Sequence, residues 1–194
     1  MKTTKAYKNY LLKKGKKPKI FSKFIQKNEL ENKENFNSFE EIEKEIWRNF
    51  AHKIQTEIDQ TEDYSAREKT LAYFYILNHL FSKNTKLISL LNNNLKSKTN
   101  ILSFQKEYSN WMKETIELAI ENKEIAPRPF LSEKYIYLFN LLLGYILRIQ
   151  QKNEPQLTEV AIEKSVNLLF DTLKTGTLDS MLDFGKFVIQ NKAF

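Results

Sequence analysis

The side chains best suited to a chemical task in this chain are lysines, and they gather at one end. Ten lysines and no acidic residue precede Asn28, so this arm carries +10, while the whole chain carries +7 and the remainder therefore −3. A localised positive end is the electrostatic pattern of phosphate-backbone binding, because each neutralised phosphate releases counterions. Charge alone leaves one alternative open, which is a solvated lysine-rich tail.

The chain offers little for metal binding or catalysis. It has no cysteine, which excludes disulfides, thiolate metal ligands and a cysteine nucleophile. His52 and His79 stand apart from any second histidine or carboxylate cluster, so we expect no metal site and no cofactor, and we interpret His79 as an interior histidine. The sequence contains no glycine-rich phosphate loop or nucleophile elbow, and we predict that the protein is not an enzyme.

Helices must position the lysine arm. The 194 residues include only four glycines and four prolines, which disfavours a fold of many short strands. Apolar spacing predicts a short helix over 4–14 that ends at Gly15, and a second helix that starts at Pro18 and ends with Asn28 in the left-handed conformation. A weaker helical pattern covers 30–36.

A long helix is predicted to follow this arm. Ser38 and Glu41 have the spacing of a capping box, in which each side chain satisfies a backbone N–H at the start of a helix. Apolar residues then recur at three- and four-residue steps to about Gln60. The Glu/Lys-rich stretch 40–45 is expected to be a solvated face of this helix.

The rest of the chain is predicted to form a helical body. Ser65 and Glu68 form a second capping box, and the helix that they open is apolar nearly all round over 71–81, as expected at the centre of a bundle. Further helical patterns lie around 87–91, 104–118, 131–151, 157–174 and 178–189. The apolar surplus over 131–174 predicts a homodimer interface through the C-terminal helices.

In order and spacing, these patterns resemble the TetR family of transcriptional regulators. The residues that carry the likeness are Ala6-Tyr7, Tyr10-Leu11 and Gly15, Phe21 and Phe24, Phe36-Asn37-Ser38-Phe39 with Ile42 and Ile46-Trp47, Tyr64-Ser65-Ala66-Arg67-Glu68-Lys69 with Leu71-Ala72-Tyr73-Phe74-Tyr75, and the stretches 163–171 and 182–187. The resemblance implies an all-α fold, with an N-terminal three-helix helix-turn-helix head at 1–46 and a ligand-binding and dimerisation body at 47–194.

One segment departs from the family pattern. Phe24 and Phe36 are twelve residues apart, about three fewer than in the family, which would shorten the DNA-reading helix by ~4.5 Å. The usual aromatic pair of that helix is replaced by Asn32-Lys33-Glu34, and Glu29, Glu31 and Glu34 would face phosphates unfavourably. The reading helix of the head is therefore predicted to be stunted.

The resemblance gives the lysine arm a specific role. At a DNA-binding head, lysines hold the phosphate backbone, while amides and a few cations read base edges in the major groove. The predicted backbone contacts are Lys16, Lys17, Lys19, Lys23 and Lys27, and the predicted base-edge contacts are Asn32 and Lys33.

An aromatic stripe in the body suggests a ligand pocket. Its residues combine apolar surface with a few polar groups, as pockets for apolar or amphipathic small molecules do. They are Phe74, Asn78, Phe104, Tyr108, Trp111, Thr115 and Tyr135. The alternative is that these residues form ordinary helix core.

Two functions follow. The first is a TetR-type transcriptional regulator that binds double-stranded DNA as a homodimer, under the control of an apolar or amphipathic ligand. The second is a TetR-like fold that has lost sequence-specific DNA reading and binds a lipid or a protein partner. With no apolar run of membrane-spanning length and no apolar segment after the N-terminal lysines, we expect a cytoplasmic protein without a transmembrane segment.

Overall fold

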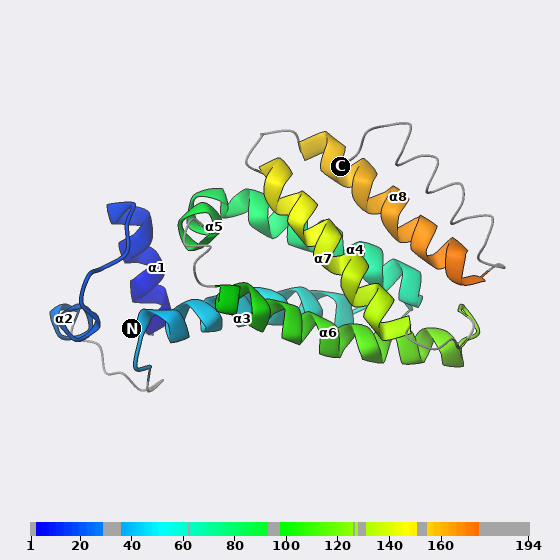
Figure 1. The fold of residues 1–194 in the computed structure, drawn as a ribbon, viewed down its shortest axis with the longest axis horizontal. Coiled ribbons are helices and arrows are strands. Elements are labelled where there is room, and N and C mark those ends of the chain that lie inside the picture. Colours follow the sequence, from blue (N-terminus) through cyan, green and yellow to red (C-terminus); the bar gives the residue numbers. More distant parts are fainter. Residues whose placement is uncertain are drawn as a thin grey trace. The chain divides into compact units, whose positions relative to one another are not determined.

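The computed structural model describes residues 3–28, 36–61, 63–92, 98–125, 127, 131–150 and 155–174. All regular structure within these ranges is α-helical, which confirms the predicted all-α fold. The helices, drawn in Figure 1, are α1 (Thr3–Lys14), α2 (Phe21–Lys27), α3 (Phe39–Asp59), α4 (Ala66–Lys83), α5 (Thr85–Asn92), α6 (Lys98–Glu121), α7 (Leu131–Gln150) and α8 (Pro155–Lys174).

The chain divides into two compact units. Unit 1 comprises Met1–Glu57 and Leu77–Asn110, and unit 2 comprises Ile58–Ile76 and Trp111–Phe194. Unit 1 therefore holds α1, α2 and α5 with most of α3, and unit 2 holds α7 and α8. Helices α4 and α6 contribute residues to both units.

Aromatic rings form the core of the N-terminal part of unit 1. Ring contacts link α1, α2 and the first residue of α3, with centroids 5.2–5.8 Å apart. The rings belong to Tyr7, Tyr10, Phe21, Phe24 and Phe39. Interlocked aromatic pairs contribute both buried area and edge-to-face attraction, so this head aromatic cluster holds α1 and α2 against α3.

The ends of α1 and α2 differ in how well the sequence predicted them. Gly15 terminates α1 in the left-handed conformation, at φ +65°, and its N–H donates to the Leu11 carbonyl at 2.8 Å, as predicted. Helix α2 begins at Phe21, three residues later than Pro18. The prediction for Asn28 is wrong: its φ is −99°, and its side-chain amide donates to the Phe24 carbonyl at 2.7 Å. The Phe24 carbonyl also accepts from the Asn28 backbone N–H at 3.3 Å, so both the backbone and the side chain of Asn28 satisfy this carbonyl at the end of α2.

The remainder of unit 1 packs around Trp47 on α3. Its indole lies 5.8–6.1 Å from the rings of Phe50, Phe81 and Phe104, measured between centroids. The predicted capping box starts α3, since the Ser38 hydroxyl accepts from the Glu41 N–H at 3.2 Å.

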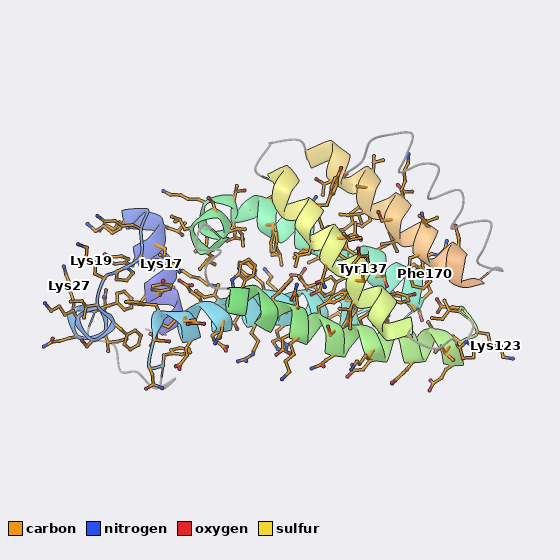
Figure 2. The ribbon with its side chains drawn as sticks, viewed as in Figure 1. Lys17, Lys19, Lys27, Lys123, Tyr137 and Phe170 are labelled. Carbon is orange, nitrogen blue, oxygen red and sulfur yellow. The ribbon has the colours of Figure 1, made fainter. Side chains whose placement is uncertain are left out.

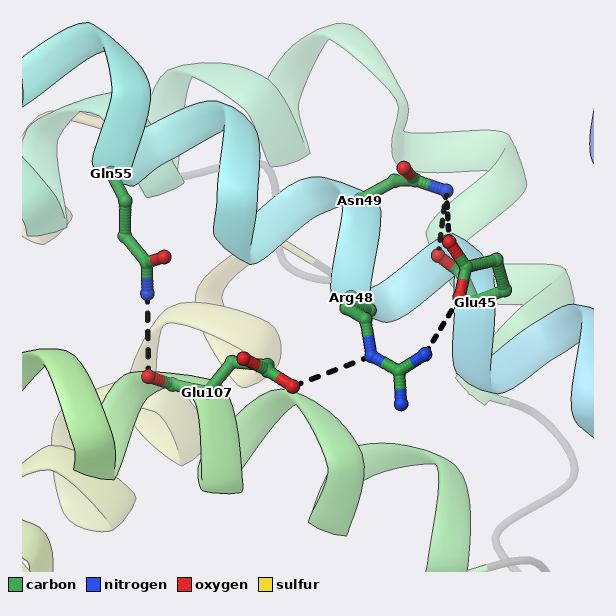
Figure 3. Close-up of polar contacts among 5 residues, drawn as sticks. All are labelled: Glu45, Arg48, Asn49, Gln55 and Glu107. Atoms are coloured by element: carbon green, nitrogen blue, oxygen red, sulfur yellow. Dashed lines mark hydrogen bonds and ion pairs between the residues drawn. The ribbon is translucent and has the colours of Figure 1, made fainter.

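Polar contacts join α3 to α6 within unit 1 (Figure 3). The Arg48 guanidinium bridges Glu45 on its own helix at 2.8 Å and Glu107 on α6 at 3.3 Å. The Gln55 amide donates to the Glu107 carbonyl at 3.3 Å. These surface contacts add orientation more than stability, because exposed ion pairs contribute little in water.

In unit 2, α7 and α8 run antiparallel side by side (Figure 1). The Tyr135 and Phe170 rings meet edge to face across the pair, with centroids 6.0 Å apart. Arg67 on α4 ion-pairs with Asp171 and lies over the Phe170 ring, 5.6 Å from its centroid. The second capping box is confirmed, because the Glu68 carboxylate accepts from the Ser65 N–H at 2.9 Å and the Glu68 N–H donates to the Ser65 hydroxyl oxygen at 3.2 Å. The Ser65 hydroxyl also donates to the Glu68 carboxylate, and this bond, with the bond from the Ser65 N–H, holds the pKa of Glu68 below its usual value.

Two further predictions, both about single side chains, are wrong, and two predicted helices lie outside the described residues. His79 is exposed on α4 rather than interior. Glu43 was expected on the solvated face of α3, yet only 1% of its surface is exposed. The predicted helix over 178–189 falls outside the described ranges, as does nearly all of 30–36.

The described residues hold neither a membrane-spanning helix nor a metal-binding cluster. No helix in this part of the chain is long and apolar enough to cross a bilayer. The same residues contain no group of three or more histidines and carboxylates able to hold a metal ion.

Candidate functional site

The predicted backbone-binding lysines lie on α2 and on the turn that precedes it (Figure 2). Lys16 and Lys19 are exposed on the turn after Gly15, and Lys23 and Lys27 are exposed on α2. Phe24 lies between the two helical lysines in sequence and is buried in the head aromatic cluster. Anchored by that ring, α2 presents its lysines to solvent on the remaining surface.

Lys17 differs from the other four lysines. Its ammonium lies 2.5 Å from the Glu43 carboxylate on α3, and its side chain is 28% exposed. Its charge is therefore balanced inside unit 1, and it fixes the turn before α2 to α3. Lys17 is thus half-buried against α3, whereas the other four lysines are exposed.

Glu43 is the centre of this arrangement. Its carboxylate also accepts a 2.6 Å hydrogen bond from the Tyr7 hydroxyl of α1. Burial raises the pKa of Tyr7 far above its usual range, and the hydrogen bond to the Glu43 carboxylate and its negative charge raise that pKa further. One buried carboxylate thus joins α1, the following turn and α3, and we call these three side chains the Tyr7–Glu43–Lys17 network.

The predicted base-edge contacts, Asn32 and Lys33, lie outside the described residues. The described part of the candidate DNA interface therefore consists of the lysines predicted to contact the phosphate backbone. The sequence predicted neither the burial of Glu43 nor the hydrogen bond that it accepts from Tyr7. The charged neighbours of Glu43 in α3 suggested instead that its side chain faces solvent.

All seven residues of the predicted ligand pocket are buried, and they divide between the two units. Unit 1 holds Asn78, Phe104 and Tyr108, whereas unit 2 holds Phe74, Trp111, Thr115 and Tyr135. Several of them have core partners inside their own unit. Phe104 packs on Trp47, and the Trp111 ring lies 4.9 Å from that of Tyr73.

Unit 2 nevertheless buries polar atoms that the described protein residues leave unpartnered. The Tyr135 hydroxyl on α7 and the Thr158 hydroxyl on α8 are both buried without a hydrogen-bond partner in the structure. Burial, with the charge of Glu124, raises the pKa of Tyr135 well above its usual range, while Arg67 acts in the opposite direction. An unpartnered buried hydroxyl costs free energy that a ligand oxygen or a water can recover.

A polar groove opens in unit 1. It encloses about 480 Å³. Its lining residues come from α1, α3, the end of α4 and the residue that follows α4: Thr4, Lys8, Glu45, Asn49, Phe50, Lys53, Leu80 and Asn84. No local sequence pattern indicated this groove, because its walls are brought together by contacts between helices distant in the chain.

One face of α7 in unit 2 carries exposed apolar side chains. Tyr137, Leu141 and Tyr145 follow one another at four-residue intervals, and they are 68%, 40% and 40% exposed. Four-residue spacing places them on one stripe of the helix. Such a stripe is more apolar than solvent-facing helix surface normally is.

Comparison with protein families identifies the C-terminal part of the chain. Residues 71–188, more than half of the sequence, match the model of the tetracycline repressor-like C-terminal domain. No curated protein and no solved structure matches the chain.

Proposed function

Because the chain belongs to the tetracycline repressor-like family of regulators, we propose that it is a transcriptional regulator that binds double-stranded DNA as a homodimer in the cytoplasm. The observation that carries the proposal is the exposed lysine surface of α2 and the turn before it, made of Lys16, Lys19, Lys23 and Lys27. No acidic residue interrupts the sequence from the N-terminus through α2, so phosphates meet a field of one sign.

The Tyr7–Glu43–Lys17 network supports this role. DNA binding by backbone contacts needs the cations at fixed positions relative to one another, because a loose lysine loses conformational entropy when it binds. The network anchors the turn that carries Lys16 and Lys19 to the long helix α3. The head therefore offers its lysines on a preorganised surface.

The α7 stripe is the proposed homodimer interface. In a twofold-symmetric dimer the same patch faces itself, so exposed rings at Tyr137 and Tyr145 would bury one another together with Leu141. A Leu141→Glu change would place like charges opposite one another across the axis. We expect sedimentation to report a monomer for this variant and a dimer for the wild type. A dimeric Leu141→Glu chain would place the interface elsewhere.

The proposed effector site lies in unit 2. Trp111, Thr115 and Tyr135 were all predicted from the sequence as pocket residues, and the unpartnered Tyr135 hydroxyl is a polar group that an amphipathic ligand could satisfy. Since the Thr115 hydroxyl already donates to the Trp111 carbonyl at 3.0 Å, Tyr135 is the preferred anchor. The alternative is that these residues form ordinary helix core. In that case we expect no saturable binding of apolar or amphipathic small molecules.

A gel shift with the chain's own upstream DNA tests the main proposal. We expect a shifted complex that is lost steeply as salt increases, because the contacts are to phosphates. Anionic phospholipid vesicles serve as the parallel sample. They test the alternative function, which the twelve-residue interval from Phe24 to Phe36 favours because it predicts a shortened reading helix. Binding to vesicles without binding to DNA would replace the proposal with that alternative.

A further inference from the structure

We propose that the polar groove of unit 1 binds a small organic anion, a carboxylate or a phosphate ester, with Lys8 and Lys53 as its cationic contacts. This anion groove lies between α1 and α3 and is closed by the end of α4. It is distinct from the lysine surface of α2 and from the effector site proposed in unit 2. Its volume of about 480 Å³ is within the range of small-molecule sites.

The environment of Lys8 is the main support for this proposal. Its side chain is half-buried on α1, and its ammonium lies 5.4 Å from the centroid of the Phe50 ring. No carboxylate of the described residues lies within ion-pair distance of it. Burial lowers the pKa of Lys8, with no opposing contribution from a nearby acid. A partly desolvated cation without an anionic partner is stabilised by an anion that enters the groove.

The one carboxylate that lines the groove is already occupied. The Glu45 oxygens bond to the Arg48 guanidinium at 2.8 Å and to the Asn49 amide at 3.3 Å, both on α3. The partners of the Glu45 carboxylate therefore lie on the same helix, α3. Lys53, the second cation, is paired only loosely with the exposed Glu57, with 3.7 Å between nitrogen and oxygen. An anion in the groove can therefore compete for Lys53.

The remaining walls define the chemistry of the ligand. Phe50 and Leu80 are 7% and 6% exposed and give the groove an apolar floor. Thr4, Asn49 and Asn84 add a hydroxyl and two side-chain amides to the lining. A compact anion with a short carbon skeleton and hydroxyl groups matches a lining that combines two lysines, apolar surface and neutral polar groups.

Occupation of the groove would also reach the DNA-binding head. The ligand would contact α1 through Thr4 and Lys8 and α3 through Asn49, Phe50 and Lys53, so it would change the freedom of α1 relative to α3. If the proposed DNA-binding function holds, anion and DNA affinities are then coupled, and the coupling is reciprocal. This consequence rests on the proposed function, whereas binding of the anion does not.

Calorimetric titration of the full chain with inorganic phosphate and with citrate, at constant ionic strength maintained by chloride, tests the site. We expect saturable binding of at least one probe, which also identifies the preferred anion class. Trp47 gives an optical signal, because its ring lies 6.1 Å from that of Phe50 in the floor. Absence of saturable binding for both probes would overturn the proposal.

Two variants with matched controls locate the binding. Lys8→Met keeps the aliphatic stem over Phe50 and removes the charge, and Lys5→Met removes an exposed charge from the same helix. Removal of a charge-assisted hydrogen bond should weaken binding of the preferred probe about ten-fold or more in Lys8→Met. Lys5→Met should bind like the wild type. Equal affinities in the two variants would contradict the proposed location.

The second pair keeps the test decisive even if Lys8→Met fails to fold. Lys53→Met and Lys44→Met each remove one α3 lysine and one exposed i,i+4 ion pair, with Glu57 and Glu40 respectively. Only Lys53 lines the groove. We expect weaker anion binding in Lys53→Met and unchanged binding in Lys44→Met, and the reverse order would refute the assignment. A gel shift with and without the preferred probe then measures the coupling to DNA separately.

Discussion

Replacing Tyr7 by phenylalanine is the sharpest test of how the head is held together. The substitution removes one hydroxyl from α1 and leaves the ring, so the contacts of Tyr7 with Phe24 and Phe39 can persist. It eliminates the 2.6 Å hydrogen bond to Glu43. The carboxylate remains buried, with the Lys17 ammonium as its partner.

The magnitude follows from burial and charge. Tyr7 is fully buried and Glu43 is 1% exposed, so water cannot replace the missing bond without opening the head. A hydrogen bond to a charged group contributes about 1.5–3 kcal/mol, and we expect Tyr7→Phe to lower the free energy of unfolding by that amount. In a chain of this size each kcal/mol corresponds to a shift in Tm of roughly 2–4 °C.

Urea unfolding followed by circular dichroism measures the effect, and Tyr10→Phe is the matched control. The Tyr10 ring touches Phe24 in the same cluster, but the side chain is only partly buried. We expect the control to stay within about 0.5 kcal/mol of the wild type, as surface changes usually do. Equal effects of the two substitutions would refute the reasoning about Glu43.

Three further predictions concern backbone caps and pH. Gly15→Ala should cost about 1–2 kcal/mol of unfolding free energy through the left-handed φ of +65° alone, because no atom lies within 4 Å of the added Cβ; thermal unfolding measures it, and an unchanged Tm would contradict it. Ser65→Ala removes the hydroxyl that accepts from the Glu68 N–H at the start of α4 and should cost about 1 kcal/mol of unfolding free energy; thermal unfolding measures the loss, and a wild-type Tm would argue against the cap. The raised pKa values of Tyr7 and Tyr135 predict a stability that is complete below the ordinary tyrosine pKa of about 10 and falls as pH rises above it, by about 1.4 kcal/mol per pH unit for each buried tyrosine. Urea titrations over that range should give a shallower slope for Tyr7→Phe, and an identical slope would count against the assignment.

Local sequence signals predicted most of the helices and their ends. The two capping boxes at Ser38 and Ser65 were recognisable from residues only three apart, and both form the predicted bonds. Gly15 was predictable for the same reason, since helix termination depends on a few neighbouring residues. The family follows from the order of these elements and is shown by the match over residues 71–188.

Interactions between distant segments could not be predicted from local pattern. The charged neighbours of Glu43 suggested a solvated face, but its partner Tyr7 is 36 residues away. The apolar neighbours of His79 suggested an interior, yet its position on α4 is exposed. Asn28 ends α2 through a side-chain bond, although its residue type equally suits the left-handed backbone. In each case tertiary packing or rotamer choice decided between two states that the residue type allows.

The anion groove illustrates the same limit at the level of a site. Nothing in the sequence distinguishes Lys8 from the other nine lysines that precede Asn28. Its half-buried position over Phe50 arises only when α1 packs beside α3. Such a cation is recognised from its burial and from the lack of a nearby carboxylate among the described residues. Both properties depend on tertiary structure and cannot be predicted from the local sequence.

The salt dependence of DNA binding tests the central claim most directly. Two variants with the same charge are compared with the wild type by fluorescence anisotropy on the upstream DNA: Lys19/Lys23/Lys27→Ala on the exposed head surface, and Lys83/Lys86/Lys106→Ala at exposed positions elsewhere in unit 1. In the head variant we expect the slope of log K against log salt to be smaller by about 0.9 for each phosphate that its lysines no longer neutralise. In the other variant we expect a slope close to that of the wild type. Identical slopes and affinities in the two variants would contradict the central claim.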